Sequence, residues 1–251
     1  MPLQPKLDLE TVNSDLEKKS PEDILAWVHE TFGNKVALQT SMQKTASTLT
    51  AMISEMKFAF DVVFVDTQYH FPETLETRDR LAEKYGIKII TLYPERTPEE
   101  QKADHGRELY LADGDYQVCC QLRKEIPWIR GVTGKYNAIL GGLMRSEGGK
   151  RSEIPIVSVD DRIRAYKIYP LANWTVEEVD RFNDEHGVPV HPLHAQGYPS
   201  IGCATCTTPV APGEDPRAGR WRHIIRQKNE DGSGEEAPTK LYCGINQGEN
   251  I

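Results

Sequence analysis

The sequence lacks any apolar run long enough to cross a membrane. Its longest apolar stretches are as short as residues 62–65 and 87–92, whereas a membrane-spanning helix needs about 20 mostly apolar residues. Residues 1–10 show neither the basic, apolar pattern of a secretory signal nor the arginine-rich pattern of a transit peptide. These absences exclude a membrane-spanning protein, and we expect a cytoplasmic one.

Positive charge is scarce as well. The chain has 30 lysines and arginines against 38 aspartates and glutamates, which gives a formal net charge of −8. A nucleic-acid partner is therefore not expected, because binding a phosphate backbone needs a concentrated basic face. A local basic pocket for a small anion remains compatible with this balance. The sequence also has no repeat with a period of tens of residues, which excludes solenoids and propellers.

Cysteine is rare, with five in 251 residues. A small, odd number does not suit a secreted protein held together only by disulfides. It does suit a set of metal ligands together with one free thiol. The cysteines are therefore the first place to look for function.

The chain does contain enough apolar residues for one large core. Its 251 residues, 38% of them hydrophobic, approach the upper end of ordinary single-domain length. Residues 229–238 are rich in Asp, Glu, Gly and Ser and have little to bury. We predict one domain over residues 1–227 and a flexible tail over residues 228–251, with homo-oligomer formation left open.

Short apolar segments alternate with helical patterns. Strands are predicted at residues 36–38, 62–65, 87–92 and 138–143, and helices at residues 45–56 and 72–85. A helix capped by Ser20 should end near Gly33, and a capping box at residues 175–178 opens another that should stop at Gly187. This alternation predicts an α/β fold with a mainly parallel sheet and helices on both faces.

Three loops should meet beyond the carboxyl ends of these strands, at residues 40–44, 66–70 and 142–145. The first precedes a helix, so Ser41, Gln43 and the helix amides are candidates for holding a phosphate; an ordinary βα turn is the alternative. Asp66 and Thr67 are candidates for nucleotide contacts, although Asp66 is equally suited to capping. His70 is interpreted as local structure rather than a catalytic base.

Two cysteine pairs could meet on one metal centre. Cys119 and Cys120 are adjacent, and Cys203 and Cys206 form a Cys-x-x-Cys loop. Structural zinc sites usually draw on two spaced loops, whereas a cubane cluster spreads its corners and tolerates adjacent cysteines better. The pattern favours an iron–sulfur cluster over zinc. Zinc stays open as an alternative, and a disulfide is disfavoured by the compartment.

Cys243 stands apart from both pairs, near the end of the predicted tail. An unpaired surface thiol is the simplest interpretation. A thiol on a mobile arm is, however, suited to moving between a closed pocket and an external reductant. A nucleophilic role requires cations that favour the thiolate, and Arg217, Arg220 and Arg222 lie just upstream.

Several motifs together resemble one family, the assimilatory adenylyl-sulfate (APS) and phosphoadenylyl-sulfate (PAPS) reductases. The resemblance runs over about residues 39–246, most of the chain. Its most specific parts are Asp66-Thr67, Phe71-Pro72-Glu73-Thr74, Cys119-Cys120 with Arg123-Lys124, Pro192-Leu193-His194, residues 197–203 and residues 215–221. The resemblance implies an adenine-nucleotide α-hydrolase-like, PP-loop-type α/β fold.

The resemblance also implies a cofactor and a reaction. Family members with these paired motifs hold a [4Fe-4S] cluster, whose ligands here would be Cys119, Cys120, Cys203 and Cys206, and they generally prefer APS to PAPS. The thiolate of Cys243 would attack the sulfate sulfur, AMP would leave, and thioredoxin or glutaredoxin would release sulfite from the S-sulfocysteine.

The anionic substrate would need cations, for which the candidates are Lys124, Arg145, Arg217 and Arg220. For each of these four side chains, the alternative is an ordinary surface charge that faces solvent and binds no substrate. The chain also departs from the family. Where the family commonly has two arginines it has Met144 and Arg145, so that Lys150 or Arg151 is a possible second source of charge.

Tyr242 and Asn246 replace the glutamate and histidine that flank the family's catalytic cysteine. Besides PAPS reduction, two other functions compete. An adenylating sulfurtransferase on the same fold is disfavoured, since residues 40–45 lack the Ser-Gly-Gly-x-Asp-Ser loop that grips pyrophosphate. A zinc-binding interaction module would use the same cysteines, with His191 or His194 as further ligands, although the family motif gives these histidines no metal role.

Overall fold

The computed structural model describes residues 5–112 and 114–230. It contains a six-stranded sheet with the order β3-β2-β1-β4-β6-β5. All neighbouring strands are parallel except β5 and β6, which form an antiparallel pair at one edge. The strands are β1 (Val36–Thr40), β2 (Asp61–Val65), β3 (Ile89–Leu92), β4 (Ala138–Leu140), β5 (Val157–Asp160) and β6 (Ala165–Ile168).

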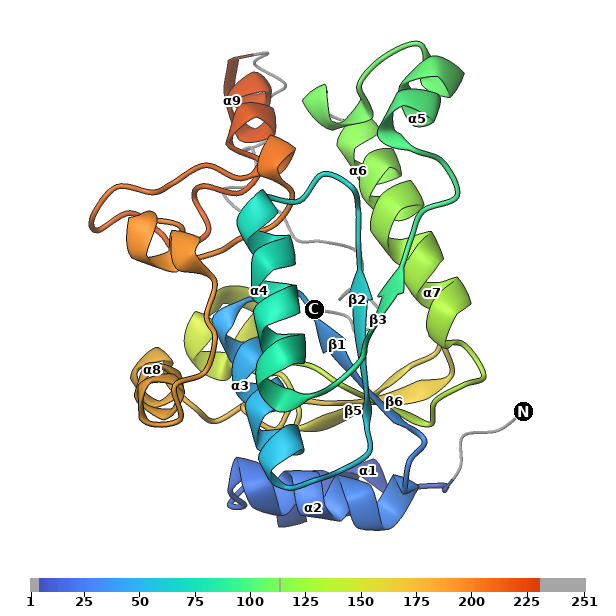
Figure 1. Ribbon diagram of the computed structural model, residues 1–251, viewed down its shortest axis with the longest axis vertical. Helices are drawn as coiled ribbons and strands as arrows, with labels where there is room; N and C mark the ends of the chain where they lie inside the picture. The colour runs from blue at the N-terminus through green and yellow to red at the C-terminus, as the bar shows by residue number, and fades with distance from the viewer. Residues whose placement is uncertain (1–4, 113, 231–251) are drawn as a thin grey trace.

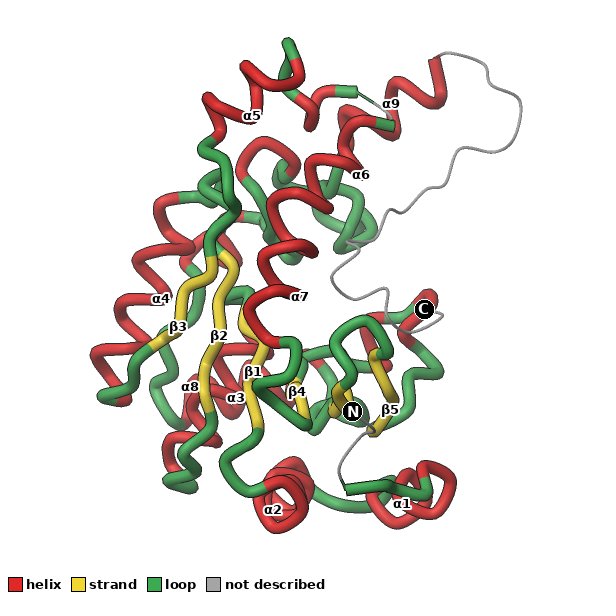
Figure 2. The backbone as a smooth tube through the Cα atoms, turned by 90° about the vertical axis from the view of Figure 1, so that its right-hand side faces the viewer, coloured by secondary structure: helices red, strands yellow, loops and turns green. Residues whose placement is uncertain are grey.

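Helices cover both faces of this sheet (Figures 1 and 2). They are α1 (Leu9–Leu16), α2 (Pro21–Phe32), α3 (Lys44–Glu55), α4 (Pro72–Tyr85), α5 (Pro98–His105), α6 (Asp115–Cys120), α7 (Ile126–Val132), α8 (Val176–Glu185) and α9 (Arg222–Glu230). The predicted α/β class, with a mainly parallel sheet between helices, is confirmed.

The alternating directions of the side chains along β1 explain why a hydrophobic core lies on each face of the sheet. Val36 and Leu38 point to one face, where they join α2 and α3 in the larger core. Ala37 points to the other, where Trp128 and Val132 of α7 complete a second core. Because successive strand residues face opposite sides, a strand that is apolar throughout has to be covered twice. β1, which is buried apart from the half-buried Gln39, is therefore central in the sheet.

Local signals set most element ends as predicted. Ser20 caps α2 by accepting a hydrogen bond from the Asp23 amide, and Gly33 closes that helix. Thr175 and Glu178 form the expected capping box. Gly86 adopts the left-handed conformation at the end of α4 (φ 60°), and the Ile87 amide bonds back to Ala82. This C-cap delays β3 to Ile89, two residues later than predicted.

Two other predicted boundaries differ more from those in the structure. The strand predicted over residues 138–143 ends at Leu140, and Gly142 then lies so close to α3 that a Cβ there would be 2.5 Å from the Thr45 hydroxyl. The chain there crosses the start of α3 instead of continuing the ladder. The predicted tail boundary after residue 227 falls within α9, so Asn229 and Glu230 are helical. Residues 231–251 lie outside the described part of the chain.

Candidate functional site

A cavity of about 480 Å³ opens at the carboxyl ends of the parallel strands. Residues from all three predicted loops line it: Ser41 and Gln43 after β1, Thr67 and His70 after β2, and Gly142 to Met144 after β4. Their meeting confirms the crevice that the strand order predicts. In doubly wound sheets, ligands bind at such an edge.

The start of α3 forms one wall of the cavity. Met42 adopts a left-handed conformation (φ 59°) with its side chain fully buried, which turns the chain from β1 into α3. Gln43 donates to the Ser41 hydroxyl and accepts from the Ile201 amide. Among the described residues no side chain caps the first turn of α3. Its free amides, with the positive end of the helix dipole, can therefore hold a phosphate.

The two candidates after β2 have different surroundings. Asp66 does not line the cavity; its carboxylate accepts from the Gln68 amide at 2.8 Å, so it shapes the turn. Thr67 lines the cavity, and its hydroxyl lies 3.3 Å from the Cys203 sulfur. Arg123 donates to the Thr67 carbonyl at 2.6 Å and is itself fully buried. Thr67 thus joins the cavity to the cysteines.

The four paired cysteines line one smaller pocket beside the cavity. Cys119 and Cys120 end α6 where it passes into the π-helical segment η2 (Gln121–Glu125), and Cys203 and Cys206 flank a single 3₁₀ turn. The Ala204 amide bonds to the Tyr69 carbonyl at 2.7 Å, which ties this turn to the end of β2. None of the four forms a disulfide.

Polar neighbours surround these sulfurs. Gln101 donates to the Cys119 sulfur, and Thr67 and Thr205 lie within hydrogen-bonding distance of Cys203 and Cys206. Burial raises the pKa of the Cys119 thiol and raises that of Cys206 to about 11, with the nearby Cys203 adding to both.

A set of four sulfurs in one place suits a thiophilic metal centre, because only bound cations would let all four ionise together. The donor set therefore fits the expected [4Fe-4S] cluster. Among the described residues, no group of three or more His, Cys, Asp and Glu side chains surrounds the position of a single metal ion.

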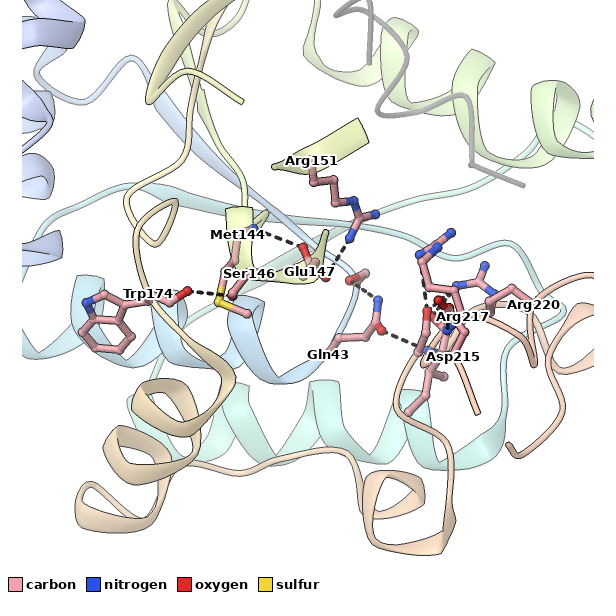
Figure 3. A network of polar contacts seen from close by, with 12 residues as sticks. Gln43, Met144, Ser146, Glu147, Arg151, Trp174, Asp215, Arg217 and Arg220 are labelled. Carbon is pink, nitrogen blue, oxygen red and sulfur yellow. Dashed lines mark hydrogen bonds and ion pairs between the residues drawn. The ribbon is translucent and has the colours of Figure 1, made fainter. Parts of the chain in front are cut away.

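Three cations face the cavity next to this pocket. Lys124 lines both the cavity and the cysteine pocket. Arg217 and Arg220 both donate to the Ser200 hydroxyl, at 3.4 and 3.3 Å, and Figure 3 shows them side by side. Arg220 is 6% exposed and lies over the Trp221 ring at 4.6 Å. The site concentrates positive charge in a chain whose net charge is negative.

The fourth predicted cation is placed differently. Arg145 does not line the cavity, since its guanidinium pairs with Glu17 at 2.5 Å and donates to the Ile154 carbonyl. That hydrogen-bonded pair also lowers the pKa of Glu17. Arg151, six positions later, does line the cavity and pairs with Glu147 at 2.6 Å. In this segment the cation that lines the cavity is therefore Arg151, which the sequence suggested only as a second source of positive charge.

Two histidines, His70 and His194, also line the cavity. Each bonds through one ring nitrogen to a backbone carbonyl, of Val65 and Tyr198 respectively. Burial is the main cause that lowers the pKa of each to about 4. Both rings are therefore neutral near pH 7, which makes them poor acids. His191 lies behind them, bonded to Thr74.

Comparison with known proteins agrees with this geometry. A family model described as the phosphoadenosine phosphosulfate reductase domain matches residues 35–209. The chain is 42% identical over 212 residues to a Streptomyces coelicolor protein named adenosine 5′-phosphosulfate reductase, covering 84% of this chain and 88% of that one. It is 38% identical over 243 residues to the protein of that name from Halalkalibacterium halodurans, covering 96% and 98%.

Solved structures resemble the fold. A phosphoadenylyl-sulfate reductase from Candida auris, in a phosphate complex, aligns with a TM-score of 0.73 at 27% identity, over 83% of this chain and 100% of that one. A Candida glabrata FMN adenylyltransferase aligns with a TM-score of 0.53 at 13% identity, over 82% and 68%, which shows a shared fold alone. The predicted α/β fold is confirmed, and the chain belongs to the phosphoadenosine phosphosulfate reductase family.

Proposed function

We propose that this protein is an oxidoreductase that reduces APS to sulfite and AMP, with thioredoxin or glutaredoxin as the electron donor. One observation carries the proposal: a single cavity has a free helix N-terminus on one wall and Lys124, Arg217 and Arg220 on another, directly beside four clustered cysteines. The relatives named APS reductases support it.

The two ends of the cavity suit the two anionic groups of APS. The phosphate belongs at the first turn of α3, where backbone amides and the hydroxyl of Ser41 are available. The sulfate belongs near Lys124, Arg217 and Arg220, because the charge shifts at that sulfur during the reaction and fixed cations stabilise it. Arg151 adds a further cation on the Met144 side of the cavity.

Cys119, Cys120, Cys203 and Cys206 would hold a [4Fe-4S] cluster beside this cavity. When bound, such a cluster supplies a polarisable charged centre next to the substrate and links the 203–206 turn to α6. Thr67 and Lys124 lie between the two pockets. They would orient the sulfate relative to the cysteines.

Cys243 would be the nucleophile; it lies outside the described residues. Its thiolate attacks the sulfate sulfur, and the bond from that sulfur to the bridging oxygen breaks with both electrons leaving on AMP. A thioredoxin thiolate then attacks the Cys243 sulfur and sulfite leaves with the electron pair of the S–S bond. The second thioredoxin thiol closes the donor's disulfide, so the dithiol supplies two electrons. This thiol chemistry suits the reducing cytoplasm.

A sulfite-release assay tests the proposal. The purified protein, kept anaerobic, is given reduced thioredoxin with APS or PAPS in parallel. We expect sulfite from APS, with a higher kcat/KM for APS than for PAPS. A higher kcat/KM for PAPS would make the protein a PAPS reductase, and no sulfite from either nucleotide would refute the reductase function.

A further inference from the structure

Glu147 is an acidic side chain in a cavity that otherwise suits anions. It lines the cavity together with Lys44, Lys124, Arg151, Arg217 and Arg220, of which Lys44 pairs with Asp180 at 2.6 Å. Among the described residues that line this cavity it is the only aspartate or glutamate. A carboxylate repels a nearby phosphate or sulfate.

The contacts of Glu147 hold its charge in place. One carboxylate oxygen lies 2.6 Å from the Arg151 guanidinium, and the other accepts a hydrogen bond from the Met144 amide at 3.1 Å. The side chain of Arg151 is 11% exposed and that of Glu147 is 30% exposed. Figure 3 shows the two side chains directed toward one another. The pair is partly desolvated, so the carboxylate offsets much of the charge of Arg151.

The cations of the cavity have different neighbours. Arg217 and Arg220 share Ser200 as an acceptor, and the Arg217 amide donates to the Asp215 carboxylate at 2.8 Å. At Arg151 the charge is offset by Glu147. The cavity is thus rich in cations, and on the Met144 side the charge of Arg151 is opposed by Glu147.

We propose that Glu147 is a specificity-determining residue that disfavours nucleotides with an additional phosphate on the ribose. The inference rests on the proposed function, in which the substrate is a nucleotide with one phosphate and one sulfate. A 3′-phosphate adds up to two negative charges. A carboxylate on the wall of the same cavity repels this added charge, which AMP lacks, because like charges repel each other.

The test compares two product-like ligands, AMP and adenosine 3′,5′-bisphosphate, which need no turnover. Their affinities for the full-length, cluster-loaded protein are measured by calorimetry. Glu147→Gln keeps the side-chain length and the oxygen that accepts from the Met144 amide, and it removes the charge. We expect the affinity for the bisphosphate, relative to AMP, to rise at least about tenfold, which corresponds to about 1.4 kcal/mol.

Glu153→Gln is the matched control. Glu153 is an exposed acid six positions away that does not line the cavity, so its loss changes the net charge equally and should leave the ratio of affinities unchanged. Glu147→Ala removes the charge together with the Met144 contact, and it must move the ratio in the same direction. Thermal unfolding confirms that each variant is folded.

The outcomes separate the inference from the proposed function. An unchanged ratio in folded Glu147→Gln, or an equal gain for both ligands, would overturn the specificity role while leaving APS reduction intact. The same rise in Glu153→Gln would reduce the effect to net charge and overturn it as well. A wild-type protein that binds neither ligand would overturn the nucleotide cavity and the inference with it.

Discussion

Arg220 offers the sharpest test of how the cavity binds its substrate. The residue is 6% exposed, and its guanidinium donates to the Ser200 hydroxyl and the Ile201 carbonyl and lies over the Trp221 ring. A Cβ on Gly202 would fall 2.2 Å from one of its nitrogens. The arginine is therefore held in one orientation before any substrate arrives. Preorganised charge of this kind acts without a reorganisation cost.

Arg220→Ala should lower kcat/KM for APS by about tenfold to a hundredfold or more. The range follows from a charge-assisted hydrogen bond, which contributes about 1.5 to 3 kcal/mol. Arg220→Lys keeps the charge but lacks the planar fork that bonds to Ser200 and stacks on the ring. It should fall between wild type and the alanine variant.

The assay is sulfite release with reduced thioredoxin over a range of APS concentrations. Arg222→Ala is the matched control, because Arg222 pairs with Glu214 and does not line the cavity. The reasoning fails if Arg220→Ala keeps wild-type kcat/KM, or if Arg222→Ala loses as much. Iron content and thermal unfolding, measured on each variant, separate lost binding from lost folding.

Three other predictions concern the cysteines and the buried histidines. Anaerobic analysis should find about four iron and four sulfide per chain; stoichiometric zinc without sulfide would contradict this. Cys243→Ser should keep iron but abolish sulfite release, whereas Cys203→Ser should lose both. Given APS without thioredoxin, the wild type should gain one adduct of about 80 Da, the mass of SO3, on the Cys243 peptide, and an adduct on another cysteine would refute that role. The pKa values of His70 and His194, lowered to about 4, lie below the value of about 6.5 in the unfolded chain, so the unfolded state binds more protons between these values and stability falls on acidification. From pH 7 to pH 5 each should cost about 2 kcal/mol of unfolding free energy, and His194→Gln should show a smaller loss in urea titrations; an equal loss would contradict the assignment.

Local chemistry explains why much of the fold can be predicted from the sequence. Helix caps and strands act over a few residues, so Ser20, Gly86 and the capping box at Thr175 mark element ends by their own backbone preferences. The alternation of apolar segments with helical patterns is enough to predict a parallel sheet. The strand order β3-β2-β1-β4 then brings the three loops to one edge.

The cysteine pairing was also visible in the sequence, because residue type and spacing limit what such a set can bind. The family resemblance, carried by several separate segments, was confirmed by the family model over residues 35–209. The nucleophilic role of Cys243 stays a prediction, since that residue lies outside the described part of the chain.

Tertiary structure decided which charged side chains face the substrate. The sequence favours Arg145 and offers Arg151 only as a second source of charge, yet Arg145 pairs with Glu17 of the segment after α1, 128 positions away, and of the two only Arg151 lines the cavity. Asp66 turned out to shape its own turn. Gly142, two residues after β4, lies close against α3, where a side chain would not fit. Ion pairs and close approaches of this kind join residues far apart in the chain, so they cannot be predicted from local sequence. The sequence by itself determined the helices, the strands and the set of cysteines. Tertiary packing decided which charged side chains line the cavity.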